Sequence, residues 1–363
     1  MSFLNKKIFS YAGDICGLDL SDLSVKVVFL QREGNADRIR SFGFAPIPVG
    51  SISDGEIQNK QQVADAIKKA FASSGPKRIK SRNVICSLPE TKAFLRVITI
   101  PEMKEEEIHE AVKWEMEANI PLPLDQVYYD WQLIGDGAGA EKGKTNLLVV
   151  AIAKNVVDQT IEVLEMADVE PFGLEIESIA QARSLISEEL EKKTALIVDV
   201  GDRRTSFTIL DMGVPCFTSS IPLCGQSLSD AIAKNMGISF DEAEKLKFSY
   251  GIGVDFKDNT ILEAVRPVLE NLVSEIERSI DFYLSGLQYS KSVDNIVICG
   301  GGANTKGIIP YLAKRLKREV ILGDPWVNIR LGNKLPGIDR KSSVQFSTAI
   351  GLALKGLNYE NIS

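Results

Sequence analysis

The sequence predicts an α/β protein of two lobes that repeat one domain, with a smaller subdomain inserted into the first lobe. Three observations predict this fold class. The length of 363 residues exceeds what a single hydrophobic core usually supports. A strand–turn–strand unit with an aspartate at its first turn occurs twice, and an additional run of strands and helices over residues 91–167 lies between the two occurrences.

The composition is that of a globular protein, and it argues against several classes of partner. Hydrophobic residues make up 44% and charged residues 25% of the chain, with a formal net charge of −7. Nucleic acids and anionic lipids select for clustered Lys and Arg, so we expect neither as the main partner. The sequence has no signal peptide and no apolar run of roughly 20 residues, so we expect a cytoplasmic chain that meets a membrane only through a partner.

Histidine and cysteine usage narrows the possible chemistry. The only histidine, His109, lies in a strongly charged helical segment, so a His-rich zinc site or a hydrolase of the Ser-His-Asp type is not expected. The five cysteines form no CxxC pair and lie mostly in apolar strand-like runs. Any chemistry must therefore depend on Asp, Glu, Lys, backbone amides and a bound metal.

The repeated unit reads GLDLSDLSVKVVFLQ over residues 17–31 and IVDVGDRRTSFTILD over residues 197–211. In each copy an apolar strand runs into an aspartate, Asp19 or Asp199, and a second strand follows a small polar turn. An aspartate at such a corner can hold Mg²⁺ while the N–H groups of the turn face a phosphate. We expect the two aspartates to face one another across a cleft with a metal between them.

Helices and strands alternate around these two units. Residues 91–167 read as a β-α-β-β-α insertion, predicted as a separate subdomain. The first lobe is then predicted to comprise residues 1–90 and 168–196 together with a C-terminal helical segment, 340–363. The second lobe covers residues 197–339, and its part from about 226 to 292 is mostly helical, with an apolar stripe along a helix over 262–287.

A glycine run, Gly300–Gly302, follows an apolar strand over 295–299 and precedes a helix over 307–316. Glycines let a ligand approach the backbone, and a helix N-terminus favours negative charge. A tight turn without a ligand explains such a run about as well, but its order after the two aspartate units favours a third nucleotide-contacting segment.

Taken together, these segments resemble the actin-like ATPase superfamily. Residues 17–30 and 197–210 resemble its two phosphate loops, residues 296–304 its adenosine loop, and the helices over 177–185 and 347–355 its connecting helices. The segment 243–247 resembles the helix whose Glu and Lys reach the ribose and adenine, although Glu244 and Lys247 also fit a simple surface pair. The resemblance implies ATP with Mg²⁺ held by Asp19 and Asp199, and it implies the following further cofactor-binding residues: Ser21, Ser24, Lys26, Gly201, Arg203, Thr205, Glu244, Lys247, Gly300, Gly301, Gly302 and Asn304.

Within that superfamily the chain resembles the PilM family of type IV pilus assembly proteins. The resemblance rests on the segments 17–30, 112–131, 197–210, 225–247 and 296–308, of which VKWEMEANIPLPLDQVYYDW at 112–131 is the most distinctive. It implies a protein at the cytoplasmic face of the inner membrane that binds other pilus proteins and the N-terminal tail of a PilN-like membrane protein, in a groove beside an FtsA-type insertion. Trp114, Glu117 and Pro121 are candidates for the groove edge, although a buried Trp and a helix-ending Pro would explain two of them.

The chain departs from the family pattern in both phosphate loops. Ser21 stands where Gly is usual, and Asp22 adds a carboxylate that Mg²⁺ or Lys26 must offset. In the second loop Arg203 and its neighbours replace small residues, and they fit either a phosphate contact or a solvated surface. We therefore expect ATP binding with slow or absent hydrolysis, with Glu177 as the residue best placed to orient a water.

Two other functions share this fold. An FtsA-like division protein that polymerises under the membrane would carry a terminal amphipathic helix, which we do not find after the last helix. A sugar- or acetate-type kinase would need a catalytic carboxylate or an Arg/His set, and only Glu177 is a candidate.

Overall fold

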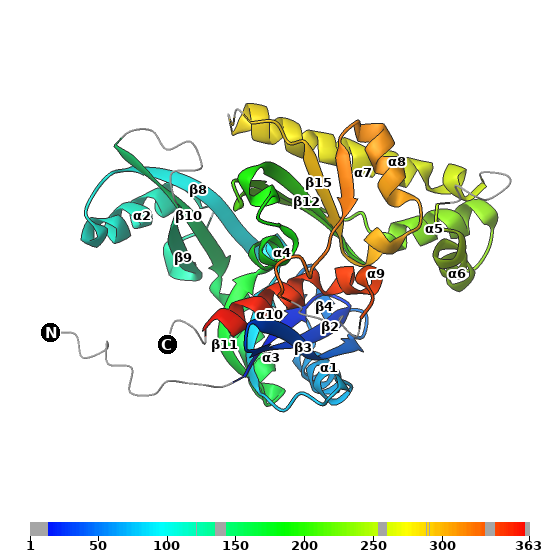
Figure 1. Ribbon diagram of the computed structural model, residues 1–363, viewed down its shortest axis with the longest axis horizontal. Coiled ribbons are helices and arrows are strands. Elements are labelled where there is room, and N and C mark those ends of the chain that lie inside the picture. Colours follow the sequence, from blue (N-terminus) through cyan, green and yellow to red (C-terminus); the bar gives the residue numbers. More distant parts are fainter. Residues whose placement is uncertain are drawn as a thin grey trace.

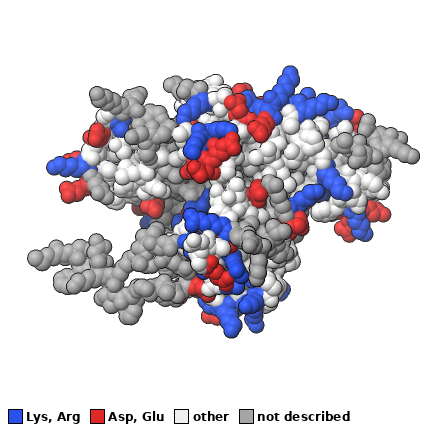
Figure 2. Space-filling model, viewed as in Figure 1, with Lys and Arg blue, Asp and Glu red and all other residues white. Residues whose placement is uncertain are grey.

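The computed structural model describes residues 14–120, 122–134, 143–252, 260–287, 289, 291–330 and 338–359. Two lobes lie one above the other in Figure 1, with the insertion projecting to one side of them. No helix in the described ranges is long and apolar enough to cross a membrane. On the face shown in Figure 2, Lys and Arg side chains lie among Asp and Glu side chains rather than apart from them.

The first lobe is built on a six-stranded sheet in the order β11-β7-β1-β2-β3-β6. Its strands are β1 (Ile15–Leu20), β2 (Ser24–Glu33), β3 (Ala36–Pro46), β6 (Gly75–Pro76), β7 (Asn83–Leu88) and β11 (Glu170–Ile176). Helices cover both faces of this sheet: α1 (Lys60–Ala72), α3 (Lys154–Met166), α4 (Glu177–Leu185) and α10 (Ser347–Tyr359). A two-stranded hairpin, β4 (Ile52–Ser53) and β5 (Glu56–Ile57), lies beside the sheet.

Successive residues of β1 point to opposite faces of the sheet, so this strand packs against helices on both faces. Cys16 and Leu18 are fully buried in the core that contains α1. Gly17 points to the opposite face, where a Cβ would lie 2.1 Å from the carbonyl oxygen of Ala349 in α10. This close approach fixes α10 against the first aspartate unit.

The second lobe repeats the central part of this topology. Its five strands, in the order β14-β13-β12-β15-β16, are β12 (Thr194–Val200), β13 (Thr205–Asp211), β14 (Val214–Ile221), β15 (Asn295–Cys299) and β16 (Glu319–Leu322). β12 pairs antiparallel with β13 and parallel with β15, just as β1 pairs with β2 and β7. The predicted repeat of a strand, an aspartate turn and a second strand is confirmed.

Helices complete the second lobe: α5 (Gly225–Met236), α6 (Phe240–Tyr250), α7 (Thr260–Asp281) and α8 (Ile308–Leu316). A short helix, α9 (Arg340–Ser343), precedes α10. The apolar stripe of α7 is buried in the core of this lobe, as its spacing predicts. The predicted helix over 262–287 changes to a π-helical turn over Phe282–Gly286, where the fully buried Tyr283 stacks on Tyr289 with ring centroids 4.6 Å apart.

The insertion forms its own small sheet, in the order β8-β10-β9. Its elements are β8 (Ala93–Pro101), α2 (Glu105–Asn119), β9 (Val127–Ile134) and β10 (Lys144–Ala153), around a core that includes Val112, Met116 and Leu147. The predicted glycine-rich turn lies mostly outside the described residues. The fifth predicted element, α3, packs against α1, and its Val163 and Leu164 belong to the core of the first lobe.

Candidate functional site

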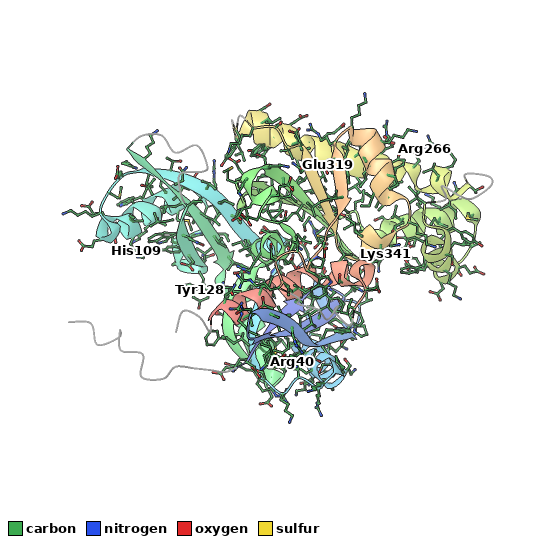
Figure 3. All side chains as sticks on the ribbon, in the orientation of Figure 1. Arg40, His109, Tyr128, Arg266, Glu319 and Lys341 are labelled. Atoms are coloured by element: carbon green, nitrogen blue, oxygen red, sulfur yellow. The ribbon has the colours of Figure 1, made fainter. Side chains whose placement is uncertain are left out.

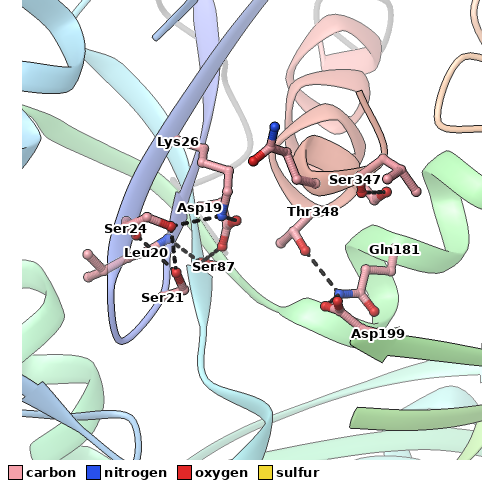
Figure 4. Close-up of polar contacts among 12 residues, drawn as sticks. Asp19, Leu20, Ser21, Ser24, Lys26, Ser87, Gln181, Asp199, Ser347 and Thr348 are labelled. Atoms are coloured by element: carbon pink, nitrogen blue, oxygen red, sulfur yellow. Dashed lines mark hydrogen bonds and ion pairs between the residues drawn. The ribbon is translucent and has the colours of Figure 1, made fainter. Parts of the chain in front are cut away.

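A cavity of about 210 Å³ lies between the lobes, where the two aspartate turns meet. Asp19 and Asp199 both line it, as do Glu177 from α4 and the first two glycines of the glycine run. Figure 4 shows Asp19 with Lys26 on one side of this space and Asp199 with Gln181 on the other. The two aspartates therefore belong to a single site contributed by both lobes.

In the first turn, Asp19 is paired within its own lobe. The Nζ of Lys26, on β2, lies 3.1 Å from the Asp19 carboxylate, and the two side chains are only 11% and 7% exposed. Burial alone would lower the pKa of Lys26, but the charge and hydrogen bond of Asp19, helped by Asp202 and Asp199, raise it. Lys26 stays charged at the floor of the cavity.

Serine hydroxyls complete this first turn. Ser24 Oγ accepts a hydrogen bond of 3.0 Å from Lys26 Nζ, and Ser21 Oγ lies 3.0 Å from Ser24 Oγ. Ser87 Oγ, at the end of β7, accepts from the Leu20 N–H at 2.8 Å. Ser21, Ser24 and Lys26 all line the cavity, as the sequence predicts.

The first turn departs from the family pattern at Ser21 and Asp22, and the structure shows the surroundings of both residues. The Asp22 carboxylate accepts the N–H groups of Asp54 and Gly55, at the tip of the β4–β5 hairpin, at 3.2 and 3.1 Å. Ser21 is not among the described non-glycine residues with positive φ, so its backbone carries no left-handed strain. Asp22 still lines the cavity, so the offset of its charge by Mg²⁺ or Lys26 beside phosphates stays a prediction.

In the second turn, Asp199 has no hydrogen bond to a Lys or Arg among the residues that the structure describes. Gln181 Nε2, on α4, donates to the Asp199 carboxylate at 2.6 Å and also lies 3.1 Å from Thr348 Oγ1 on α10. Burial first, and then the negative charge of Asp19, raise the pKa of Asp199 to about 6, against the lowering effect of Lys26. The site thus holds more negative charge than its own cations neutralise.

The residues that follow Asp199 divide between the cavity and the opposite lobe. Gly201, Asp202 and Arg203 line the cavity. Arg204 reaches across it: one guanidinium nitrogen lies 2.9 Å from the Asp54 carboxylate in the first lobe, and another donates to Ser220 Oγ at 2.9 Å. Thr205 does not face the cavity, because its buried hydroxyl donates to the Leu223 carbonyl at 2.6 Å.

Glu177 begins α4 at the wall of the cavity. Burial, followed by the charges of Asp19 and Asp199, raises its pKa well above the ordinary range of a glutamate. This environment disfavours the charged carboxylate, the form that would accept a proton from water.

Close packing requires glycine at two of the three positions of the glycine run, and not at the third. A Cβ on Gly300, whose φ is +82°, would lie 2.1 Å from Asp199 Oδ1, and one on Gly302 would lie 2.4 Å from Val200 Cγ1. Gly301 has room for a Cβ, with only Asp202 Oδ1 at 3.6 Å. Packing against the second turn therefore requires two of the three glycines, and Gly301 alone leaves open space toward the cavity.

The remaining predicted residues lie behind the second turn rather than in the cavity. Lys247 is 8% exposed, and its Nζ donates to the Gly225 carbonyl at 2.9 Å and pairs with Glu244 at 2.6 Å. Gly225 N–H in turn donates to the Gly201 carbonyl at 3.0 Å. The pair is thus not a solvated surface pair: it supports the loop that lines the cavity. Asn304 Oδ1 is buried with no hydrogen-bond partner in the described part of the chain.

Two of the predicted groove residues, Trp114 and Glu117, do not line the interlobe cavity. Trp114 is 70% exposed on α2, so the interpretation of a buried Trp is wrong; Glu117 is exposed on the same helix, and Pro121 lies outside the described residues. His109 is also on the exposed side of this helix (Figure 3). A different cavity, of about 540 Å³, lies between the insertion, α4 and the β13–β14 turn.

The donor set of the interlobe cavity fits a metal-bound polyphosphate better than a metal alone. Among the residues that the structure describes, no group of three or more His, Cys, Asp or Glu is placed to hold a metal ion. Mg²⁺, however, is usually held by one or two carboxylates together with waters and phosphates. Asp19 and Asp199 supply the carboxylates, while Lys26, Arg203 and the turn N–H groups are available to phosphate oxygens.

Sequence reasoning missed Gln181, Thr348, Ser87 and Glu90 at this site. Gln181 lies one helical turn after Glu177 on α4, so a search for polar residues at i+4 would have found it. Ser87 and Glu90 gave no such signal, because their roles depend on strand pairing and on contacts between segments distant in the chain.

Comparison with known proteins gives a consistent result. The model of the type IV pilus assembly protein PilM family matches residues 17–357. A solved PilM-PilN type IV pilus biogenesis complex contains a chain 26% identical to this one, with a TM-score of 0.79 over 95% of this chain and 98% of that chain. The cell division protein FtsA of Staphylococcus epidermidis is 23% identical over 95% of this chain and 79% of its own length. MreB5 of Spiroplasma citri bound to ADP, at 16% identity and a TM-score of 0.53 over 97% and 98% of the two chains, shares the actin-like two-lobed fold.

Proposed function

The chain belongs to the PilM family of type IV pilus assembly proteins, and from that premise we propose that it is an ATP-binding scaffold for a membrane partner. ATP with Mg²⁺ occupies the interlobe cavity, and the N-terminal tail of a PilN-like protein occupies a groove beside the insertion. The observation that carries the nucleotide part is the convergence of Asp19, Lys26 and Asp199 on one cavity.

Each turn contributes a different chemistry to nucleotide binding. Lys26, held charged by Asp19, and the hydroxyls of Ser21 and Ser24 offer donors to phosphate oxygens. Asp199 contributes a carboxylate whose unneutralised charge a divalent cation would offset. Bound Mg²⁺ would supply the positive charge that this cavity lacks. Arg203 adds a further cation at the rim.

Hydrolysis is slow or absent in this proposal. Glu177 is the best-placed group to orient a water, but burial and the neighbouring aspartates raise the pKa of its carboxyl and so disfavour the charged form that would act as a base. The nucleotide therefore acts mainly by joining the two lobes, with contacts that exist only when both turns engage it. FtsA-like relatives make a filament-forming protein the second candidate function, which pelleting of the purified chain with Mg²⁺-ATP would reveal.

The cavity of about 540 Å³ is the best candidate for the groove that binds the tail. Its floor is apolar, with Leu148, Ile179 and Ile186, and the last residues of β9 form one wall. Arg183 and Asn328 add polar groups at its edge. An extended peptide with apolar side chains fits such a groove, and binding there would bring the chain to the inner face of the membrane through its partner.

Thermal unfolding with Mg²⁺-ATP tests the nucleotide part of the proposal. Binding to the folded state alone stabilises it by about 2.7 kcal/mol when the ligand is at 100 times its Kd, so the melting temperature should rise by several degrees. An unchanged melting temperature at millimolar Mg²⁺-ATP would reject nucleotide binding.

Titration with a synthetic N-terminal tail of the PilN-like partner tests the groove. Ile134→Glu places a charge at the cavity wall and should weaken tail binding at least about tenfold, because burying an unpaired charge is costly. Trp114→Ala is the matched control on the same subdomain, outside the cavity. If Trp114→Ala abolishes binding and Ile134→Glu does not, the groove lies along α2, as Trp114, Glu117 and Pro121 predict.

A further inference from the structure

A short turn joins the first lobe to the insertion directly beside the interlobe cavity. This 3-10 turn, Glu90–Lys92, connects the end of β7 to the start of β8. Glu90 and Thr91 both line the cavity. The chain that enters the insertion thus passes the proposed nucleotide site on its way.

Glu90 is a buried carboxyl at a junction of three parts of the molecule. Its side chain is 6% exposed, and Oε2 accepts the Ser178 N–H at 3.2 Å in the first turn of α4. The turn also contacts β14 of the second lobe, where Thr218 acts to lower the pKa of the same carboxyl. In return, the backbone N–H of Glu90 donates to Glu177. The buried Glu90 and the half-buried Glu177 therefore join the turn to α4, and the turn also contacts the second lobe.

Burial acts on both glutamates of this junction. It raises the pKa of Glu90, against the lowering effect of Ser178 and Thr218. Glu90 Oε1 has no hydrogen-bond partner among the described residues. Burial therefore disfavours a further negative charge at this point, beside the buried Asp19.

The other end of the turn, Thr91 and Lys92, contacts Asp54, and Asp54 contacts both aspartate turns. Thr91 Oγ1 donates to the Asp54 carbonyl at 3.3 Å, and Lys92 Nζ lies 3.6 Å from its carboxylate. The Asp54 carboxylate also pairs with Arg204 of the second aspartate turn. The Asp54 N–H donates to the Asp22 carboxylate of the first aspartate turn. Any change in how the two loops approach each other therefore acts on this turn.

Beyond the turn, β8 carries the connection into the second lobe. β8 contacts β14, and Val97 of β8 packs against the core of the second lobe. The insertion is thus held between the turn at one end of β8 and β14 along its length. A small displacement of β14 relative to α4 must either break the Thr218 contact with Glu90 or move β8 with it.

We propose that the Glu90–Lys92 turn, with Glu90 as its positioning residue, couples occupancy of the interlobe cavity to the placement of the insertion against the second lobe. The inference rests on the proposed nucleotide binding and adds the route by which that binding reaches the groove for the tail. It requires that Glu90 hold α4 and β14 together when the cavity is filled.

Hydrogen exchange of the full chain, with and without saturating Mg²⁺-ATP, tests this coupling. In the wild type we expect Mg²⁺-ATP to slow exchange in β8 and β14 at least about fivefold, the lower end of typical coupling between sites. In Glu90→Gln and Thr218→Val, each at its own saturating concentration, the slowing in β8 should fall below about twofold. Glu102→Gln, an exposed residue just after β8, is the matched control and should behave as the wild type.

The outcomes separate the two proposals. If the wild type binds no Mg²⁺-ATP, the proposed function fails and the inference fails with it. If the wild type binds Mg²⁺-ATP, and both variants melt cooperatively and still show full slowing in β8, only the inference is overturned. Thr218→Val keeps the test decisive if Glu90→Gln does not fold, because it removes one hydroxyl and leaves both glutamates in place.

Discussion

The two aspartate turns share one topology but carry their charge in different ways. Asp19 is paired with Lys26 at 3.1 Å inside its own lobe, whereas the partner of Asp199 within the described ranges is the neutral amide of Gln181, at 2.6 Å. The neighbouring strand differs correspondingly. Ser87 supports the first turn through the Leu20 N–H, while the residue paired with Asp199 is the buried Cys299, followed by Gly300.

This difference bears on the proposed nucleotide binding. The charge of Asp19 is balanced within the protein by Lys26, which lines the cavity. Asp199 has a raised pKa, and a ligand cation would stabilise its charged form. In the proposed function, the Lys26 side of the cavity would therefore meet the phosphates and the Asp199 side would meet the metal.

Removing Lys26, the cation of the first turn, should have the largest effect on the free energy of unfolding. Lys26→Met leaves Asp19 buried without its partner, and breaking a buried pair by removing one member costs about 3–5 kcal/mol of the free energy of unfolding. Urea denaturation measures this loss. Lys60→Met is the control: it removes an exposed ion pair, in which Lys60 Nζ lies 2.5 Å from the Glu162 carboxylate, and should lower the free energy of unfolding by no more than about 1 kcal/mol. Equal losses in the two variants would contradict the difference in burial.

Replacing Asp199 by the neutral Asn should change the free energy of unfolding by a smaller amount than Lys26→Met does, and in the opposite direction. The size of this change should depend on pH. The folded protein holds a proton on Asp199 up to about pH 6, whereas an unfolded aspartate releases it near pH 4. The folded state therefore binds more protons in this window, so this group makes the fold less stable as pH rises from about 4 to about 6. Asp199→Asn should match or exceed the wild-type stability at pH 7, by up to roughly 2–3 kcal/mol.

The check is the stability difference between Asp199→Asn and the wild type, measured by denaturation from pH 4 to pH 7. The advantage of the variant should shrink as pH falls through 6 and vanish near 4. Parallel stability curves for the two proteins would contradict a raised pKa at Asp199.

Breaking the bridge between the turns should have the smallest effect on stability. Arg204→Ala removes the contact with Asp54, whose side chain is 53% exposed, so we expect a loss of about 1 kcal/mol or less. Arg204→Lys would keep the charge but not the second hydrogen bond to Ser220. A loss of several kcal/mol in the alanine variant would mean that the bridge, rather than the cores of the lobes, holds them together.

The parts predicted from the sequence are those that depend on local pattern. The strand, aspartate and turn of each repeat could be read because alternating apolar residues and turn residues act within a few positions. The association of Asp19 with Asp199 was predicted from the duplication of that unit. The strands and helices of the insertion were also recognised, since each has its own periodicity.

The parts that could not be predicted depend on contacts between distant segments. Asp22 turns to the β4–β5 hairpin, and Lys247 is buried against the Gly225 carbonyl, because tertiary packing brings those backbone groups within reach. The packing of α3 on the first lobe likewise depends on α1. Glu90 had no motif at all, since its partners lie on α4 and β14.

The central claim is tested most directly by the Mg²⁺-dependence of ATP affinity in the wild type and in Asp199→Asn, measured by titration calorimetry. We predict that the wild type binds ATP at least about tenfold more tightly with Mg²⁺ than with EDTA, and that Asp199→Asn loses most of this difference while still binding metal-free ATP through the Lys26 side of the cavity. Equal Mg²⁺-dependence in the two proteins, or no heat of binding in the wild type at millimolar Mg²⁺-ATP, would contradict a metal-bound nucleotide between the two turns.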